Sequence, residues 1–400
     1  MPIRGITAAE SAAVIPRIGG SLGRPSLDLL RQLSDANVLG AVLDEGPGSR
    51  ADLAARTGLS KPTVSQAVGR LIDAGVLAEA GRAEHSGRGR AGTVVTLADG
   101  SPCALVLRAG GAGLLGEVVR ADGEVLAREE RTFDLPVSAR RLSSALRHLA
   151  ASLADQARGG IAAVGVSIAN PVDRQGRTVN LPGSPFLTGG LDVGAAVGLS
   201  VAPLVDNDVN WALLAEHRLG AASGCTHVVQ VHLGVGLGSA ILSESALVRG
   251  SRGFAGEITH AVTDPAAARR SGAASGRRHD PLAGSLLGQL SELGLLAPGA
   301  VGVDLTRVQA ALDRGGDRAQ RLLEAITATV RGACHLLDPE VVVLDGPWGR
   351  HPRVVEAVRD ALGADEVVAA DVRVARLDDG PLTGARLGAL DALRAALLPA

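Results

Sequence analysis

Apolar residues recur with the 3.6-residue period of amphipathic helices in three stretches near the N-terminus. The first spans residues 26–44, with Ser26 as the expected N-cap and a Gly-Pro-Gly sequence directly after it. Its apolar stripe consists of Leu29, Leu30, Leu33, Val38, Val42 and Leu43. Two shorter patterns follow, at Ser49–Thr57 and Ser60–Asp73, joined by Gly58 and Leu59. These patterns predict a long helix followed by a helix pair with a tight turn.

Strand-like patterns begin after this helix pair. Gly75–Ala80 and Thr93–Leu97 predict two strands, and the segment between them carries Arg82, Arg88 and Arg90. From about residue 103, apolar strand-like runs alternate with helical patterns, which is typical of an α/β fold. These runs are Ala104–Leu107, Ala163–Ile168, Val228–Leu233 and Val341–Leu344. The chain is therefore divided into a flexible tail (1–24), a small helical module with two strands (25–100) and a large α/β region (101–400).

The small module has the features of a DNA-binding helix-turn-helix. Val64, Val68, Leu71 and Ile72 recur at helical spacing and predict a buried face, which leaves the opposite face polar. Short polar side chains at the start of such a helix suit the major groove, and a strand pair with arginines at its tip suits the DNA backbone or minor groove. The candidate DNA contacts are Ser60, Lys61, Thr63, Ser65, Gln66, Arg70, Arg82, Arg88 and Arg90. The alternative is a solvated helix pair with a flexible hairpin.

Composition narrows the function only slightly. The 40 basic and 42 acidic residues nearly cancel, so no net field attracts the whole chain to nucleic acid. Three Phe, two Trp and no Tyr argue against base stacking as a way of recognition. Cys103, Cys225 and Cys334 are far apart, which predicts reduced core residues in a cytoplasmic protein. We find neither a signal-peptide pattern nor an apolar run long enough for a membrane span.

The motifs of both regions together resemble one known family. The sequence SRADLAARTGLSKPTVSQAVGRLIDAGVL resembles the winged helix-turn-helix of the regulator branch of the ROK family (repressors, open reading frames, kinases). Further matches are VGVSIANPVD, VNLPG, DNDVNWALLAE, HLGVGLGSAIL, GFAGEITH and VVVLDG, so that the resemblance covers most of the chain. It implies an actin-like (ribonuclease H-like) sugar-kinase fold with two α/β lobes and a sugar cleft between them, preceded by a winged helix.

The resemblance also implies a set of sugar contacts. Asp208 matches the aspartate that acts as general base in ROK kinases, and Asn207, Asn180, Glu257 and His260 match further sugar contacts. Carboxylates and amides form paired hydrogen bonds with vicinal hydroxyls, so this chemistry suits a sugar. Read alone, Asp208 and Asn207 are also ordinary turn or helix-capping residues, and His260 an ordinary core histidine.

Departures from the kinase pattern predict that catalysis is lost. The first phosphate loop, D-x-G-G-T in the kinases, reads Arg108-Ala-Gly-Gly-Ala, and the second, G-T-G, reads Gly234-Val-Gly. The glycine pair on the adenosine side is replaced by Asp345-Gly-Pro. Phosphoryl transfer needs metal and positioned donors around the phosphates, so no catalytic residue and no ATP or Mg²⁺ binding are expected. Arg108 either binds a phosphate group directly or is simply solvated.

The family's zinc motif has no counterpart, because residues 261–290 contain no cysteine. We therefore expect no metal and no other cofactor. The predicted function is a sequence-specific DNA-binding regulator, a repressor, that binds an inverted repeat as a homodimer or homotetramer. A sugar or sugar phosphate would control it, and no membrane partner is expected. The alternatives are an active sugar kinase with an accessory DNA-binding domain and a regulator that senses no ligand.

Overall fold

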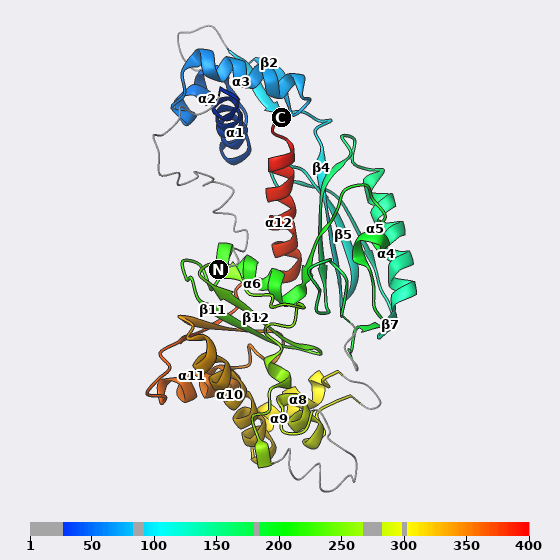
Figure 1. Ribbon diagram of the computed structural model, residues 1–400, viewed down its shortest axis with the longest axis vertical. Helices are drawn as coiled ribbons and strands as arrows, with labels where there is room; N and C mark the ends of the chain where they lie inside the picture. The colour runs from blue at the N-terminus through cyan, green and yellow to red at the C-terminus, as the bar shows by residue number, and fades with distance from the viewer. Residues whose placement is uncertain (1–26, 83–91, 180–183, 267–281, 298–301, 400) are drawn as a thin grey trace.

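The computed structural model describes residues 27–82, 92–179, 184–266, 282–297 and 302–399. The predicted tail (1–24), Arg88, Arg90, Asn180 and most of the cysteine-free loop lie outside these residues. Figure 1 shows an elongated molecule, with the N-terminal helices at one end and α8 (Leu286–Glu292) and α9 (Leu305–Arg314) at the other. Within the described ranges, no helix combines the length and apolarity needed to cross a membrane.

Three helices and a small sheet form the N-terminal module. The helices are α1 (Leu27–Glu45), α2 (Arg50–Thr57) and α3 (Lys61–Asp73). The strands β1 (Gly48–Ser49), β3 (Thr93–Leu97) and β2 (Leu77–Arg82) form an antiparallel sheet in that order. Ser49 begins α2 with a reciprocal capping box to Asp52, and Gly58 ends it at a left-handed φ of 69°. The module is therefore a winged helix, as the periodicity predicts.

The apolar stripe expected along the first helix is only half correct. Val38 and Val42 are buried against the rest of the module. Leu29, Leu30 and Leu33 are instead 45%, 49% and 52% exposed. The first turns of α1 extend past the module's core. The apolar periodicity in these turns therefore predicted the helix correctly but not the burial of its apolar face.

The first lobe is a five-stranded sheet in the order β10-β8-β4-β5-β6. Its strands are β4 (Cys103–Gly110), β5 (Gly113–Val119), β6 (Val125–Arg131), β8 (Ile161–Ile168) and β10 (Leu204–Asn207). Leu105 and Leu107 face α4 (Ala139–Ala154) and α5 (Val193–Val197), and alternate residues of β4 face α12 (Gly380–Ala396). The short strands β7 (Val137–Ser138) and β9 (Leu187–Thr188) pair beside this lobe.

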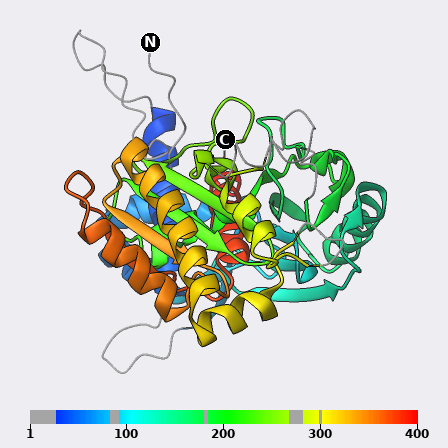
Figure 2. The ribbon, with the colours of Figure 1, turned by 90° about the horizontal axis from the view of Figure 1, so that it is seen from below.

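The second lobe is another five-stranded sheet, in the order β13-β12-β11-β14-β15. Its strands are β11 (Val228–Leu233), β12 (Leu237–Ser243), β13 (Ala246–Leu247), β14 (Val341–Asp345) and β15 (Asp371–Val374). One face packs on α6 (Asp208–Leu219). The other packs on α10 (Asp317–Leu337) and α11 (Pro352–Gly363), which lie side by side in Figure 2. Cys103, Cys225 and Cys334 are buried in three separate cores, as predicted.

Two helices, α6 and α12, pack against each other where the lobes meet. Their backbones are so close that a Cβ at Gly384 of α12 would lie 1.9 Å from the carbonyl oxygen of Trp211 on α6. The far end of α12 reaches the winged helix: Leu393, with Leu397 just beyond the helix, belongs to the same apolar cluster as Val38 and Val42. The helix α12 therefore extends from the junction of the lobes to the N-terminal module (Figure 1).

Candidate functional site

The helix α3 presents a polar face opposite a fully apolar one. Ser60 caps it by accepting a hydrogen bond from the Thr63 backbone N–H, and Lys61, Ser65 and Gln66 are exposed. Val64, Ala67, Val68 and Leu71 are completely buried. The first turns of this helix thus have a buried apolar face and an exposed polar face, as a helix that enters a DNA groove requires.

Arg70 is not the free outward-facing side chain that helical spacing predicted. Its guanidinium makes a bidentate contact with Asp35 of α1, with Nη2 2.6 Å from Oδ1 and Nε 3.0 Å from Oδ2. Asp35 is 2% exposed and would otherwise be a buried unpaired charge. Arg70 therefore ties α3 to α1. Arg82 ends β2, but its side chain, like those of Arg88 and Arg90, lies outside the described residues, so the wing contacts stay predictions.

A cavity of about 670 Å³ lies between the two lobes. Asn207, Asp208, Glu257 and His260, four of the five predicted sugar contacts, line it. The fifth, Asn180, is outside the described residues. The two carboxylates and two neutral donor groups come from separate segments of the chain, so the fold brings together residues that lie up to 53 positions apart in sequence.

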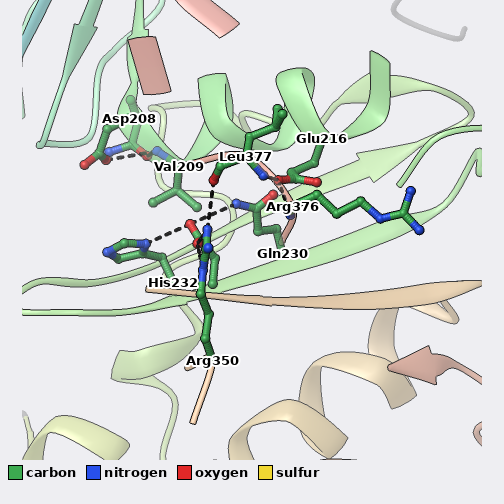
Figure 3. Close-up of polar contacts among 10 residues, drawn as sticks. Asp208, Val209, Glu216, Gln230, His232, Arg350, Arg376 and Leu377 are labelled. Atoms are coloured by element: carbon green, nitrogen blue, oxygen red, sulfur yellow. Dashed lines mark hydrogen bonds and ion pairs between the residues drawn. The ribbon is translucent and has the colours of Figure 1, made fainter. Parts of the chain in front are cut away.

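Asn207 and Asp208 reach the cavity because they stand where β10 ends and α6 begins. The Asn207 Oδ1 accepts a hydrogen bond from the Val209 backbone N–H at 2.9 Å, so this residue is also the N-cap of α6. Asp208 Oδ1 accepts from the same N–H (Figure 3). Burial raises the pKa of Asp208, while the charge of His232 and a hydrogen bond from Asn207 act in the opposite direction.

Glu257 is the N-cap of the single-turn helix η1 (Ile258–His260), and His260 is its last residue. The Glu257 Oε2 and His260 Nδ1 atoms are 3.6 Å apart. Burial, with a smaller contribution from the charge of Asp208, raises the pKa of Glu257 to about 7. Burial also lowers the pKa of His260. The cavity therefore contains two carboxylates in a poorly solvated setting, where a ligand that donates hydrogen bonds would stabilise them.

A second polar cluster in the cavity was missed by sequence reasoning. The His232 Nδ1 lies 3.0 Å from Asp345 Oδ2, and Arg350 Nη2 donates to Asp345 Oδ1 at 2.9 Å and to the Leu377 carbonyl at 2.8 Å (Figure 3). Burial raises the pKa of Asp345, but His232 and Arg350 outweigh it and hold this pKa at about 2. Burial lowers the pKa of His232, but Asp345 and Asp208 outweigh it and raise the pKa above its usual value.

The pairing of these residues follows from sheet register. The strands β11 and β14 are parallel, with His232 directly beside Asp345 although 113 positions separate them. Only the strand order could have revealed this pair, because each residue alone is an isolated polar position at the end of an apolar run.

Arg108 is neither solvated nor free. Its Nη1 lies 3.0 Å from Oδ2 of Asp379, the N-cap of α12, and its side chain is 22% exposed. Its Nε is buried and has no hydrogen-bond partner among the described residues. Arg108 lines the cavity beside the turn at Gly110–Gly113, and the turn at Gly234–Gly236 lines it from the other lobe. A positive charge thus stands beside the first glycine turn of the cavity.

Comparison with known sequences accounts for both regions. The profile of the ROK family matches residues 104–386, and the profile of the MarR family matches residues 27–89. The xylose repressor of Bacillus subtilis (strain 168) is 23% identical over 237 residues, which cover 59% of this chain and 62% of the repressor. The chain therefore matches less than two thirds of the length of that relative.

Two solved structures share the fold. A ROK family transcriptional regulator, described as a homologue of the Escherichia coli MLC protein, is 19% identical with a TM-score of 0.65. That similarity covers 92% of this chain and 99% of the regulator. A ROK hexokinase from Thermus thermophilus is 26% identical with a TM-score of 0.53, covering 72% of this chain and 97% of the hexokinase. The actin-like sugar-kinase fold preceded by a winged helix, expected from the motifs, is thereby confirmed.

Proposed function

The chain belongs to the ROK family, and from that premise we propose that it is a sequence-specific DNA-binding transcription regulator, a repressor, controlled by a sugar or sugar derivative. The winged helix would bind an operator built as an inverted repeat, and a homodimer or homotetramer would supply two copies of it. The repressor named among its relatives supports the regulatory role. No metal, ATP or other cofactor is part of this proposal.

The observation that carries the proposal is the path of α12. Its first residues, Gly380 and Pro381, line the cavity, and its last turns share a core with the winged helix. Seventeen residues span about 25 Å in a helix. Arg394 adds a contact near the module, 3.6 Å from Asp44 of α1. A change in the cavity that moves the start of α12 would therefore move the DNA-binding module.

The cavity suits a sugar because two poorly solvated carboxylates and an amide line it together. Asp208 and Glu257 are half-buried, and their raised pKa values reflect poor solvation. Sugar hydroxyls would donate to both carboxylates, and the amide of Asn207 would donate to a hydroxyl or ring oxygen. Aromatic residues are too few for stacking on a sugar face to dominate.

We propose that the cavity does not transfer phosphate. Arg108 replaces the carboxylate that would support Mg²⁺–ATP, and the second glycine turn carries Val235 in place of a hydroxyl. The competing function is a sugar kinase, which the retained Asp208 favours. A coupled assay of ADP release over a panel of hexoses and pentoses separates the two. Turnover that Asp208→Asn abolishes would replace our proposal with the kinase.

The regulator itself is tested with DNA. A mobility-shift assay with fragments from the gene's own upstream region should find one inverted repeat that binds more tightly than the same sequence scrambled. No preference for any repeat would exclude sequence-specific regulation. A thermal-shift screen of sugars, amino sugars and their phosphates then separates a sensor from a regulator without a ligand, since a specific ligand raises the melting temperature.

A further inference from the structure

We propose that the part of the cavity between the two glycine turns binds an oxyanion group of the effector, either a phosphate ester or a carboxylate, and that Arg108 and His232 hold it. The sugar part of this ligand rests on the proposed function. The anion subsite does not, because it is argued from donors that the sugar set leaves unused.

Arg108 supplies the first donor, from β4 of the first lobe. One edge of its guanidinium is fixed by Asp379, while its Nε is buried without a partner among the described residues. The Nε is enclosed by the protein, so the donor that a ligand in the cavity can reach is Nη2. This atom has no hydrogen bond among the described residues, and it belongs to a cavity-lining side chain that is 22% exposed. The arginine fork matches the oxygens of phosphate and carboxylate groups.

His232 supplies the second donor, from β11 of the second lobe. Its Nδ1 is directed at Asp345, which leaves Nε2 without a hydrogen bond among the described residues. This Nε2 lies against the second glycine turn, because a Cβ built on Gly234 would be 2.7 Å from it. The absence of a side chain at residue 234 therefore keeps the space in front of the imidazole open.

Each donor is oriented by a carboxylate that has a second partner. Asp345 is also bound by Arg350, and Asp379 also accepts from the Leu382 backbone N–H at the start of α12. Arg350 neutralises Asp345, so the positive charge on His232 stays available for a ligand, whereas Arg108 shares its charge with Asp379 and offers the ligand an N–H donor. A metal ion would meet two cationic side chains here, whereas an oxyanion would meet two donors.

The position of Asp208 links this subsite to the sugar. Asp208 and His232 line the same cavity, and the charge of each shifts the pKa of the other. A sugar hydroxyl held by Asp208 would therefore carry any attached phosphate toward His232 and the glycine turns. The anion would then join donors from both lobes and lie beside Asp379, where α12 begins. Its binding would draw the lobes together at the helix that leads to the winged helix.

The two tryptophans provide the readout. Trp348 Nε1 donates to the Gly234 carbonyl at the second glycine turn, whereas Trp211 Nε1 donates to Val166 in the core between α12 and the first sheet. The full-length protein labelled with 5-fluorotryptophan should give two ¹⁹F resonances, assigned with Trp211→Phe. Titration with inorganic phosphate at constant ionic strength should shift the Trp348 resonance saturably.

Variants identify the donors. Arg108→Ala and His232→Gln should each weaken phosphate at least about tenfold, the value of one charge-assisted hydrogen bond. Arg120→Ala is the matched control, since Arg120 is similarly exposed at 27%, is paired with Asp122 and does not line the cavity. It should leave the titration unchanged. Acetate in place of phosphate, and gluconate against glucose 6-phosphate, distinguish a carboxylate from a phosphate ester.

Two outcomes would overturn the subsite. The first is the absence of a saturable Trp348 shift with either anion while circular dichroism reports folded protein. The second is an unchanged phosphate titration in both Arg108→Ala and His232→Gln. Operator binding that a neutral sugar releases, without any response to anions, would reject the subsite and keep the proposed function. Saturable anion binding by a protein that prefers no operator would keep the subsite and reject the proposed function.

Discussion

The exposed face of α3 and the cavity between the lobes are both polar, but the side chains on α3 are solvated whereas those in the cavity are partly buried and have shifted pKa values. Lys61, Ser65 and Gln66 on α3 are exposed to solvent. In the cavity, Glu257 has a pKa raised to about 7, and Asp345 has one held at about 2 by its cationic partners. A solvated side chain can be replaced at little cost in the free energy of unfolding, whereas replacing a buried charged group is expected to change both ligand binding and stability. The four changes below test that contrast, in order of decreasing effect.

The largest effect is expected for Asp208→Asn. This nearly isosteric change removes an acceptor and leaves sugar hydroxyls unpaired in the cavity, which should raise the half-saturating concentration of the releasing sugar by about 100-fold or more. Titration of operator release with the sugar identified by thermal shift measures it. Operator affinity without sugar should be unchanged, because α3 is untouched. An unchanged sugar response would remove Asp208 from the binding set.

Arg70→Ala should destabilise the winged helix by about 2–3 kcal/mol, because it leaves Asp35 buried without its partner. Chemical denaturation followed by circular dichroism measures the loss. Gln66→Ala, at an exposed position of the same helix, is the control and should change stability by less than about 0.5 kcal/mol. Adding Asp35→Asn to Arg70→Ala should recover part of the loss. If Arg70→Ala were as stable as Gln66→Ala, the ion pair between Arg70 and Asp35 would contribute nothing to stability.

Glu257 predicts a pH dependence of stability. Its folded-state pKa of about 7 lies above its usual value of 4.5, so the folded state retains a proton that the unfolded state has lost. The free energy of unfolding should therefore fall by about 2 kcal/mol between about pH 5 and pH 7 and level off above. Asp208 and His260 also titrate nearby, so the difference between wild type and Glu257→Gln isolates the effect. The exposed Glu356→Gln should keep the full dependence.

Features encoded by local sequence were predictable. The caps at Ser49 and Ser60, the turn at Gly58 and the buried stripe of α3 follow from neighbouring residues, and all are present. Four predicted sugar contacts that line the cavity could be named because motifs carry them, and their role stays a prediction. In each case a short stretch of sequence contains both the signal and its physical cause.

Features that depend on distant contacts were not predictable. Asp35 captures Arg70 across 35 positions, and His232 meets Asp345 only through the register of two parallel strands. Helical spacing placed Arg70 on the outward side of α3, but a long side chain can bend back to a buried carboxylate. The path of α12 to the winged helix could not be predicted either, since the apolar periodicity of a helix does not say which surface it covers.

The smallest effect is expected for Lys61→Ala, and it completes the contrast within α3. Lys61 is exposed at the first turn, so its loss should leave the melting temperature unchanged. Operator affinity should fall by about 1 kcal/mol, and the slope of log affinity against log salt should decrease by about one, because one phosphate contact is lost. Fluorescence anisotropy at several salt concentrations measures both. Ser65→Ala, which removes no charge, should leave the salt slope as it is. An unchanged slope for Lys61→Ala would mean that the chain's only lysine lies away from the DNA backbone.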